Sequence, residues 1–428
     1  MKITILAIGT TGDVRPLIAL GLRLREAGHE VCIATDSLFG NFVSHYQLEP
    51  FLIKSNIKEL HEKATELAAF EIGKNPLRLW REAEGLIKMM IQQVGPGCWE
   101  ACQSAEAIVC SLAGAYFAPH ISERLNVPSI PALFCPMTPT REFPSKLIPT
   151  KFNLGGTLNR LTWILDDIIT ILAWLPFRTW INQWRVEQLN LQPLSVNYFK
   201  EVKQLRRVQK ILIYAFSPSV VPKPPDWDHL IHITGYLFLD RSPNWQPPAD
   251  LVDFLSSGPP PVYIGFGSMI IRNPEGIMDI ILRALERTKQ RGVIAAGWGG
   301  LGETDLPDNV FQVESVPHDW LFPQMAAVIH HGGAGTTASG LRAGIASIVV
   351  PIYGDQPFWG RRVASLGVGP DPIPLKLLSV ERLENAITDV IHNKEIRRRA
   401  AVLGERIRSE DGMTWAVEVI QKHLFSSR

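Results

Sequence analysis

The sequence is poor in cysteine, and its five cysteines form no recognisable set. Their number is odd and no two stand in a C-x-x-C pair, so the spacing that a disulfide framework or a structural zinc site requires is missing. The cysteines are Cys32, Cys98, Cys102, Cys110 and Cys135. Because isolated thiols fit a reducing compartment, we expect a cytoplasmic protein.

Net charge and long apolar runs are missing too. The formal net charge is +1 at pH 7, which indicates no surface for nucleic acid. The first apolar run is broken by Gly9, Gly12 and Asp13, so we expect no signal peptide. The sequence has no uncharged apolar run of the roughly eighteen residues that a membrane-spanning helix needs, so we predict no transmembrane helix.

Residues 161–177 form the most apolar stretch. Asp166 and Asp167 interrupt it, and Pro176 lies near its end. The pattern favours a helix that is buried or faces an apolar bound molecule. The alternative, a surface that rests on a membrane, stays open.

The length and composition are typical of a globular chain with two or three domains. Residues 2–8 alternate and are β-branched, which predicts a strand, and Pro16 and Gly28 indicate the first turn and the end of the next helix. A second strand at 31–35 completes a βαβ unit of a parallel sheet. Because the turn at 9–13 is not G-x-G-x-x-G, we expect no nicotinamide dinucleotide site.

Asp13 lies in this first turn. A carboxylate there caps the following helix, or it serves the crevice in which parallel sheets bind their ligands. The residues alone favour neither interpretation.

Residues 328–357 predict strand, glycine loop, helix, strand, glycine loop and helix. The small residues of the first loop allow a ligand to approach the backbone, and Thr336 opens a helix whose N–H groups suit a diphosphate. His331, at the end of the strand, can donate to the same oxygens. Asp355 and Gln356, in the second loop, accept from and donate to sugar hydroxyls. Together the two turns predict a nucleotide-sugar site.

The run H-H-G-G-A-G-T-T at 330–337, followed by G-D-Q at 354–356, resembles the donor segment of nucleotide-sugar-dependent glycosyltransferases of the GT-B kind. The resemblance is strongest to sterol glucosyltransferases and bacterial antibiotic glucosyltransferases, and it covers nearly the whole chain. It implies an α/β fold with two doubly wound, parallel-sheet, Rossmann-like domains facing across a cleft. The implied parts are an acceptor domain at 1–240, a linker at 241–260, a donor domain at 261–408 and a helix at 409–428 that crosses back to the first domain.

The resemblance also implies a mechanism. The run G-T-T-G-D-V-R-P at 9–16 is similar to the family's G-S-R-G-D-x-x-P, whose aspartate is the catalytic base, and Asp13 matches it. Relatives with a His-Asp dyad carry the second aspartate near the strand at 107–111, which here ends with Ser111, so we expect Asp13 to act without such a partner. The resemblance favours UDP-glucose as donor, with no metal ion or other cofactor. The implied donor-binding residues are Gly12, Gly267, Ser268, Ser315, Val316, His318, His331, Gly333, Ala334, Gly335, Thr336, Asp355 and Gln356.

Residues 136–144 resemble the P-M-P-W-T-x-T-x-x-Y/F-P segment of sterol glucosyltransferases, although the segment is shorter here and lacks the tryptophan. The implied acceptor-binding residues are Met137, Thr138, Phe143 and Trp163. The run at 226–228 imitates a D-x-D metal site, but it follows two prolines and ends no strand, so we expect no metal there.

We therefore predict an inverting glucosyltransferase that acts on a hydroxyl of a sterol-like or other apolar alcohol, with carotenoid, phenolic and macrolide acceptors left open. A nucleotide-sugar 2-epimerase of the same architecture is a rival hypothesis, and a non-catalytic lipid or sugar carrier is another. An epimerase needs no apolar wall, whereas the N-terminal half is rich in tryptophan. These residues are Trp80, Trp99, Trp163, Trp174, Trp180 and Trp184. We expect a monomer and leave peripheral membrane contact open.

Overall fold

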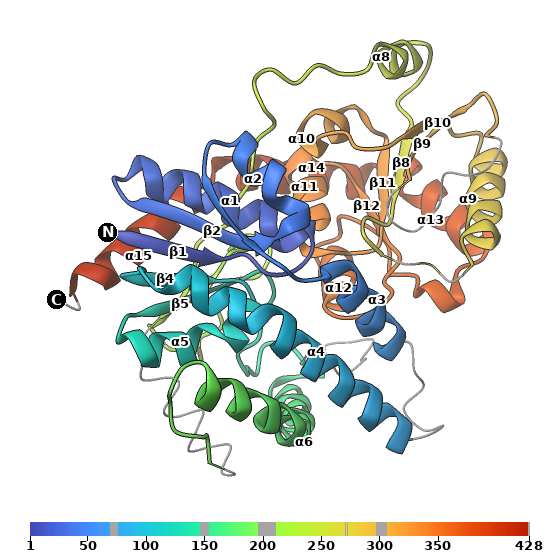
Figure 1. Cartoon of the computed structure of the whole chain (residues 1–428). Helices are drawn as coiled ribbons and strands as arrows, with labels where there is room; N and C mark the ends of the chain where they lie inside the picture. The colour runs from blue at the N-terminus through green and yellow to red at the C-terminus, as the bar shows by residue number, and fades with distance from the viewer. Residues whose placement is uncertain are drawn as a thin grey trace. The chain divides into compact units, whose positions relative to one another are not determined.

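The structure is a computed structural model that describes residues 1–68, 76–145, 154–195, 211–269, 271, 273–296 and 306–426. The chain divides into two compact units, each with its own sheet and helices (Figure 1). Unit 1 comprises Met1–Pro218, Pro222–Leu239 and Asp411–Arg428, and unit 2 comprises Ser219–Val221 and Asp240–Glu410. The fold is therefore α/β with two parallel-sheet units, as the sequence predicts.

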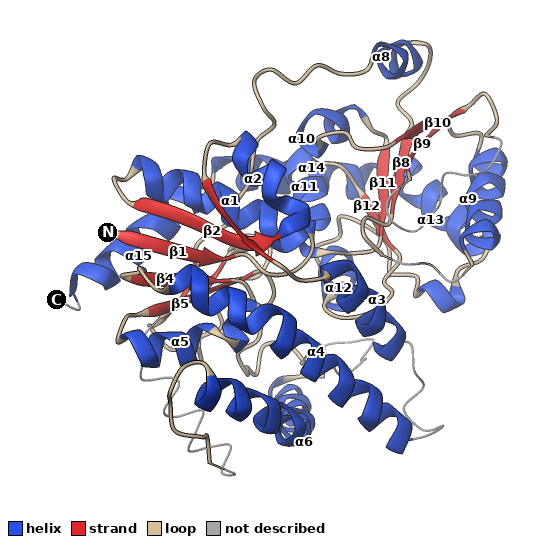
Figure 2. Cartoon of the chain, in the orientation of Figure 1, coloured by secondary structure: helices blue, strands red, loops and turns tan. Residues whose placement is uncertain are grey.

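Among its described residues, unit 1 has a seven-stranded parallel sheet in the order β3-β2-β1-β4-β5-β6-β7 (Figure 2). The strands are β1 (Lys2–Leu6), β2 (Glu30–Asp36), β3 (Glu49–Ile53), β4 (Ala107–Cys110), β5 (Ser129–Leu133), β6 (Leu212–Tyr214) and β7 (Ile231–Ile233). The helices are α1 (Thr11–Glu26), α2 (Gly40–His45), α3 (Ile57–Ala68), α4 (Pro76–Cys102), α5 (Ala118–Leu125), α6 (Gly156–Glu187) and α15 (Gly412–Ser426).

Strand β1 shows why the sheet of unit 1 is covered on both faces. Ile3 and Ile5 belong to one hydrophobic core, which α1 and α15 complete. Leu6, which points the other way, belongs to a second core, built with α4, α5 and α6. Because alternate side chains of a strand point to opposite faces, a strand with apolar residues on both faces, such as this one, serves two helical layers.

Unit 2 has, among its described residues, a five-stranded parallel sheet in the order β10-β9-β8-β11-β12. The strands are β8 (Val262–Gly265), β9 (Gly292–Ala295), β10 (Val310–Val313), β11 (Ala327–His330) and β12 (Ser347–Val349). The helices are α8 (Ala249–Ser256), α9 (Pro274–Thr288), α10 (His318–Leu321), α11 (Ala334–Ala343), α12 (Gln356–Ser365), α13 (Val380–His392) and α14 (Lys394–Ser409).

Several boundaries differ from those that the sequence predicts. Helix α1 begins at Thr11, so Pro16 lies inside it rather than in its first turn. The helix begins early because the Asp13 carboxylate accepts the N–H of Thr10 and caps the first turn. The strand predicted at 2–8 ends at Leu6. The strand predicted at 31–35 runs from Glu30 to Asp36.

Candidate active site

The sheet of unit 2 changes direction between β8 and β11. The next strand in sequence after β8 is β9, yet β8 is hydrogen-bonded to β11 on its other side. The turns that follow β8 and β11 therefore lead away from each other, and parallel sheets bind ligands at such points, beyond the carboxyl ends of the strands. Most of the donor residues that the sequence predicts lie in the turns after β8, β11 and β12.

The His331 imidazole is held between two glycine turns. A Cβ atom on Gly333 would lie 2.4 Å from the Nε2 atom of His331, and one on Gly267 would lie 3.0 Å from its Cε1 atom. Gly267 also has a φ of +60°, a conformation that glycine adopts most readily. His331 is 7% exposed. The two glycines thus leave room for this ring, as a larger residue at Gly333 would not.

Helix α11 turns its N-terminus toward the same loop. Its N-cap is Gly333, which has no capping side chain, and the N–H of Thr337 donates to the Gly333 carbonyl oxygen at 2.9 Å. The N–H groups of Ala334, Gly335 and Thr336 precede that bond, so they have no acceptor within the helix. A Cβ atom on Gly335 would meet nothing within 4 Å. This helix end is suited to an anion.

His330 shapes the loop from behind, and the sequence analysis missed it. Its Nδ1 atom accepts from the N–H of Gly332 at 3.0 Å, and Gly332 has a φ of +90°. Burial, followed by the nearby histidines His331 and His318, lowers the pKa of His330 to about 3. The ring is therefore neutral, with its proton on Nε2. The sequence feature that could have identified His330 is a polar residue at the end of an otherwise apolar strand.

The third turn, after β12, differs from the expectation in its details. The Gln356 side chain is buried, and its Oε1 atom accepts from the backbone N–H groups of Ile352 at 2.7 Å and Tyr353 at 3.1 Å. Its Nε2 atom donates to the Met269 sulfur. Asp355 accepts from the indole N–H of Trp359 at 2.8 Å. Gln356 therefore organises the turn and links it to the turn after β8, which its predicted role as a projecting ligand did not include.

Three of the predicted donor-binding residues, Ser315, Val316 and His318, come after β10. Ser315 is exposed and Val316 is half-buried. The His318 ring stacks on Phe322 with ring centroids 4.2 Å apart. Ser268, next to Gly267, is half-buried.

Asp13 of unit 1 occupies the first turn of α1. Its Oδ2 atom accepts from the N–H of Thr10 at 2.9 Å and from the Thr10 hydroxyl at 3.3 Å. A Cβ atom on Gly9, whose φ is +136°, would lie 2.2 Å from that oxygen. The carboxylate therefore caps the helix, whose N-terminus stabilises negative charge. Gly12, beside it, is exposed.

Ser111 stands just beyond β4, and β4 neighbours β1 in the sheet. Its hydroxyl donates to the carbonyl oxygen of Ile8 at 2.7 Å and accepts from the N–H of Ile8 at 3.2 Å and of Gly114 at 3.3 Å. Ile8 leads into the turn that carries Asp13. Ser111 thus positions this turn through its backbone, and it is a supporting residue that the sequence analysis did not assign.

The predicted acceptor segment, residues 136–144, is held by contacts across long sequence distances. Buried Tyr214 accepts through its hydroxyl from the N–H of Met137 at 2.8 Å and pairs with the Thr138 hydroxyl at 2.8 Å. The indole N–H of Trp163, a residue 3% exposed, donates to the Phe143 carbonyl oxygen at 3.0 Å. Burial raises the pKa of Tyr214. Tyr214 is a further residue that the sequence analysis did not single out.

The Asp226 carboxylate also holds the predicted acceptor segment. It accepts from the Thr140 hydroxyl at 2.7 Å and from the N–H of Arg141 at 2.9 Å. No three His, Cys, Asp or Glu side chains lie together as a metal cluster in the described ranges. The D-x-D-like run therefore uses its first carboxylate to hold the acceptor segment.

The tryptophans of the N-terminal half whose side chains the structure describes do not form an exposed wall. Trp174 and Trp184 are buried in the core beneath α4 and α5. Trp99 and Trp180 are half-buried against that core, and the side chain of Trp80 lies outside the described part. Packing explains the described tryptophans. They therefore do not exclude a 2-epimerase.

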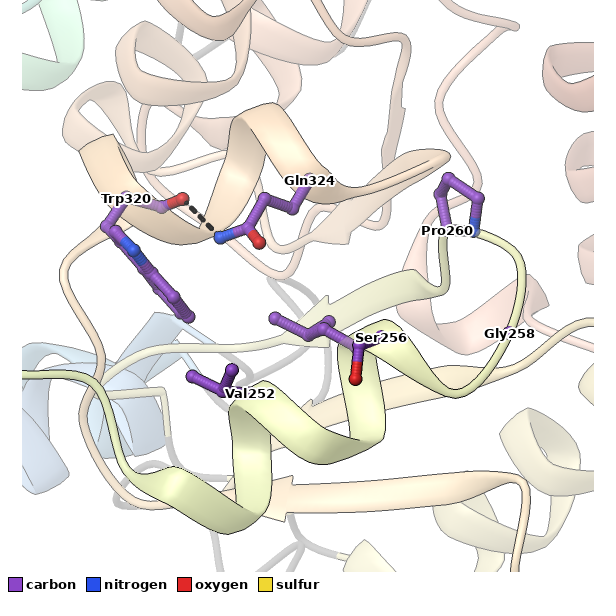
Figure 3. Close-up of a pocket in the computed structure, with 7 residues that line it drawn as sticks. Val252, Ser256, Gly258, Pro260, Trp320 and Gln324 are labelled. Carbon is purple, nitrogen blue, oxygen red and sulfur yellow. Dashed lines mark hydrogen bonds between the residues drawn. The ribbon is translucent and has the colours of Figure 1, made fainter.

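A pocket of about 340 Å³ lies elsewhere in unit 2, between α8 and the segment that enters β11 (Figure 3). Val252, Trp320 and Gln324 are among its lining residues, and the Gln324 amide donates to the Trp320 carbonyl oxygen at 2.9 Å. The lining also includes Pro260, just before β8 begins. Its elements meet where the strands begin, whereas the candidate site follows the ends of the strands.

Two family profiles match the chain. Residues 3–144 match the Glycosyltransferase family 28 N-terminal domain, and residues 294–422 match the Erythromycin biosynthesis protein CIII-like C-terminal domain. Two sterol 3-beta-glucosyltransferases of Arabidopsis thaliana are each 39% identical to the chain over 99% and 100% of its length. One from Sclerotinia sclerotiorum is 35% identical over 99%. The chain spans 68% and 66% of the plant proteins and 29% of the fungal one.

Solved structures agree on the fold. The glycosyltransferase of kitacinnamycin superimposes with a TM-score of 0.69 at 19% identity, and the alignment covers 99% of both chains. The calicheamicin glycosyltransferase CalG4 superimposes with a TM-score of 0.67 at 17% identity, over 99% of this chain and 98% of that one. At such identities the likeness concerns the fold alone.

Proposed function

The chain belongs to the sterol 3-beta-glucosyltransferase family, and from that premise we propose that it transfers glucose from UDP-glucose to the hydroxyl of a sterol-like alcohol, with inversion at the anomeric carbon. The chain is a glycosyltransferase by family; the donor, the acceptor and the residue roles are the proposal. The observation that carries it is the group of three contacting turns in unit 2.

The diphosphate of the donor has a suitable place in those turns. His331 is fixed between Gly267 and Gly333, and the N–H groups at the start of α11 point out of the same loop. A helix N-terminus contributes roughly 0.3–2 kcal/mol toward an anion, and a hydrogen bond to a charged group about 1.5–3 kcal/mol. Several such contacts together stabilise a leaving diphosphate without a divalent cation.

The sugar lies, in this proposal, at the turn after β12. Asp355 accepts from two neighbouring hydroxyls, while Gln356 keeps the turn in shape through Ile352 and Tyr353. Ser315, Val316 and His318 flank the nucleotide base. Glucose is proposed as the sugar because the relatives are named sterol 3-beta-glucosyltransferases. UDP is proposed as the nucleotide from the resemblance of the donor segment to that family.

Asp13 is the general base. Its carboxylate takes the proton of the acceptor hydroxyl while the oxygen attacks the anomeric carbon from the face opposite the diphosphate. The bond from that carbon to the phosphate oxygen breaks, and UDP leaves. One displacement inverts the centre, so an α-linked donor gives a β-glycoside. The hydrogen bonds from Thr10 hold the carboxylate in place.

The acceptor is an apolar alcohol that binds along Met137, Thr138 and Phe143, and that reaches the enzyme from a lipid surface. The segment is anchored from below by Tyr214 and Trp163, so its conformation is set before the alcohol binds. Such preorganisation reduces the entropy cost of binding. The enzyme acts as a monomer, with no cofactor besides the sugar nucleotide.

An acceptor screen tests this function. The protein is incubated with UDP-glucose and, in turn, a sterol, a carotenoid alcohol, a phenol and a macrolide, and products are found by mass spectrometry. We expect a sterol glucoside as the main product. UDP release or a changed sugar without any acceptor would instead indicate a 2-epimerase, and binding without turnover would indicate a carrier.

The proposed absence of a metal ion has a separate test. We expect EDTA to leave the transfer rate unchanged, because the helix end and His331 provide the positive potential. Loss of activity in EDTA with recovery in magnesium or manganese would contradict this account of leaving-group stabilisation.

A further inference from the structure

A second pocket in unit 2, of about 480 Å³, is larger than the one in Figure 3 and shares Pro260 with it. Two of its lining residues, Met325 and Ala326, directly precede β11, and a third, Ala346, directly precedes β12. The donor turns follow the ends of these same strands. The pocket therefore lies at the opposite edge of the sheet from the candidate active site. We call it the Lys289 pocket, after another of its lining residues.

Apolar side chains make up most of the lining. Met325 and Ala346 are 3% and 2% exposed, and Ile345 and Ile391 are half-buried. The backbone is already paired there, since the Ala346 carbonyl oxygen accepts from the N–H of Val328 at 3.0 Å. The lining therefore offers an apolar ligand close packing, and its volume is typical of a site for a small organic molecule.

Two cationic side chains belong to the same lining. Lys289 is the C-cap of α9, and Arg397 lies in the first turn of α14; both are exposed. Neither side chain forms a hydrogen bond or an ion pair with any residue that the structure describes. The neighbouring cations of α14 differ, because Arg398 and Arg399 both pair with Glu395 at 2.8 Å. Lys289 and Arg397 are thus available to an anion from solution.

Acidic side chains do not neutralise this pair of cations. None of the described residues that line the pocket is acidic. Asp389, two residues before the lining residue Ile391, accepts from the Asn393 amide at 3.1 Å. Glu286, one turn before Lys289 on α9, is exposed and forms no ion pair with it. The lining therefore combines two positive charges and no negative one with an apolar surface.

We propose that the Lys289 pocket binds a single-chain amphiphile with an anionic head, such as a fatty acid. The chain packs on Met325, Ile345 and Ile391. The head contacts Lys289 and Arg397, whose guanidinium group suits a carboxylate through two parallel hydrogen bonds. Inorganic phosphate and nucleotides have the charge but lack the apolar chain, so they gain only exposed charge contacts, which are weak. The proposed binding does not depend on the glucosyl transfer proposed above.

Calorimetry with a series of small probes tests this proposal. The purified full chain is titrated with decanoate, octanoate, decanol, decylammonium and acetate, with saturating UDP present so that the donor site is filled. Detergent is left out of the buffer because its apolar tail would compete for the lining. No helix in the described part of the chain is long and apolar enough to cross a membrane.

We expect decanoate to bind and octanoate to bind about tenfold more weakly, because two buried methylene groups are lost. Decanol should bind at least about tenfold more weakly than decanoate because it has no charge. Decylammonium, which Lys289 and Arg397 repel, and acetate, which has no chain, should give no measurable binding.

Variants locate the binding in this pocket. Lys289→Met combined with Arg397→Met should weaken decanoate binding at least about tenfold. Ala326→Leu should weaken it several-fold, because the larger side chain fills part of the pocket while both charges remain. The matched control combines Lys376→Met with Lys394→Met, which removes two exposed lysines of unit 2 outside the lining, and should bind decanoate as the wild type does. Melting temperatures verify that all variants fold.

Three results would overturn the proposal. The first is that the wild type binds no decanoate. The second is that decanol or decylammonium binds as tightly as decanoate, since the charge of the head would then have no effect. The third is that the variant lacking Lys289 and Arg397 binds decanoate as tightly as the wild type, which would place the ligand elsewhere on the chain. None of these results depends on whether the protein transfers glucose.

Discussion

The candidate residues of unit 1 and those of unit 2 are held in place in different ways. In unit 2, three turns after neighbouring strands contact one another: His331 approaches Gly267, and Gln356 donates to Met269. In unit 1, Met137 is held by Tyr214, 77 residues away, and Thr140 by Asp226, 86 residues away. A site made of local turns leaves a short motif in the sequence, whereas a site made of distant contacts does not.

The difference predicts how each unit responds to change. Variants in unit 2 alter affinity for the nucleotide or the sugar, because each turn contacts one part of the donor. A variant of Asp13, the proposed base in unit 1, lowers the rate of glucose transfer and leaves nucleotide binding unchanged.

Asp13→Asn keeps the size of the side chain and its acceptor oxygen for Thr10, but it loses the basic carboxylate. We expect kcat to fall on the order of 10²–10⁴-fold, with UDP affinity unchanged by calorimetry. Thr10→Val is the control, because it removes only the hydroxyl contact to Asp13 and should affect thermal stability more than rate. An Asp13→Asn rate within about threefold of the wild type would show that another group is the base.

His331→Ala should weaken UDP binding by about 10–100-fold, the loss expected for a hydrogen bond to a charged group. Gly333→Ala should reproduce much of that loss, because its Cβ would lie 2.4 Å from the imidazole Nε2 and displace the ring. Ser339→Ala, one turn further along α11, is the control. Calorimetry that finds wild-type affinity in Gly333→Ala would place the ring outside the diphosphate site.

Asp355→Asn keeps an acceptor for the Trp359 indole N–H but removes the charge proposed to bind sugar hydroxyls. We expect UDP-glucose to bind roughly 5–30-fold more weakly, from the loss of about 1–2 kcal/mol, while UDP binds as before. Gln356→Ala should instead lower the melting temperature, because two backbone N–H groups lose their acceptor. A competition between UDP-glucose and UDP-galactose measures the preference; equal ratios in wild type and Asp355→Asn would remove Asp355 from the sugar site.

The smallest expected effect is a loss of folding stability at acidic pH. The folded pKa of His330 is about 3 because of burial, and its unfolded value is about 6.5. Since the folded value is the lower one, His330 contributes stability that is present above pH 6.5 and is lost as the pH falls toward 3. His120 in unit 1, also buried and beside Arg185, has a pKa of about 3 and acts in the same direction.

Urea unfolding at pH 7 and pH 5 checks this effect. We expect His330→Gln, which retains an acceptor for the N–H of Gly332, to lose less stability between the two pH values than the wild type does. An unchanged difference would mean that His330 titrates normally in the folded state.

The sequence predicts unit 2 well because its chemistry lies in strand-end motifs. The positions of the glycine loop and of α11 follow from the small residues and from Gly344, which ends the helix in a left-handed conformation. The role of Gln356 could not be predicted, since a buried amide and an exposed one look alike in sequence. The same holds for Asp13, whose position inside α1 depends on its hydrogen bonds to Thr10.

In unit 1 the sequence leaves more unpredicted. The pairing of Tyr214 with the acceptor segment requires the sheet to bring β6 beside β5, which no local pattern encodes. The sequence left open whether residues 161–177 are buried or exposed. The structure shows both, because Trp163 is buried while Leu161 and Leu165 are exposed. Periodicity gives the two faces of a helix, but only the fold decides which of them is covered.

The stereochemistry of the product shows whether glucose is transferred in a single inverting displacement. The protein is incubated with UDP-glucose and a sterol in vesicles, and the anomeric configuration of the purified glucoside is read by proton NMR. An inverting displacement with Asp13 as base predicts a β-glucoside, which Asp13→Asn forms at a strongly reduced rate. An α-glucoside, or a β-glucoside formed at an undiminished rate by Asp13→Asn, would contradict the account.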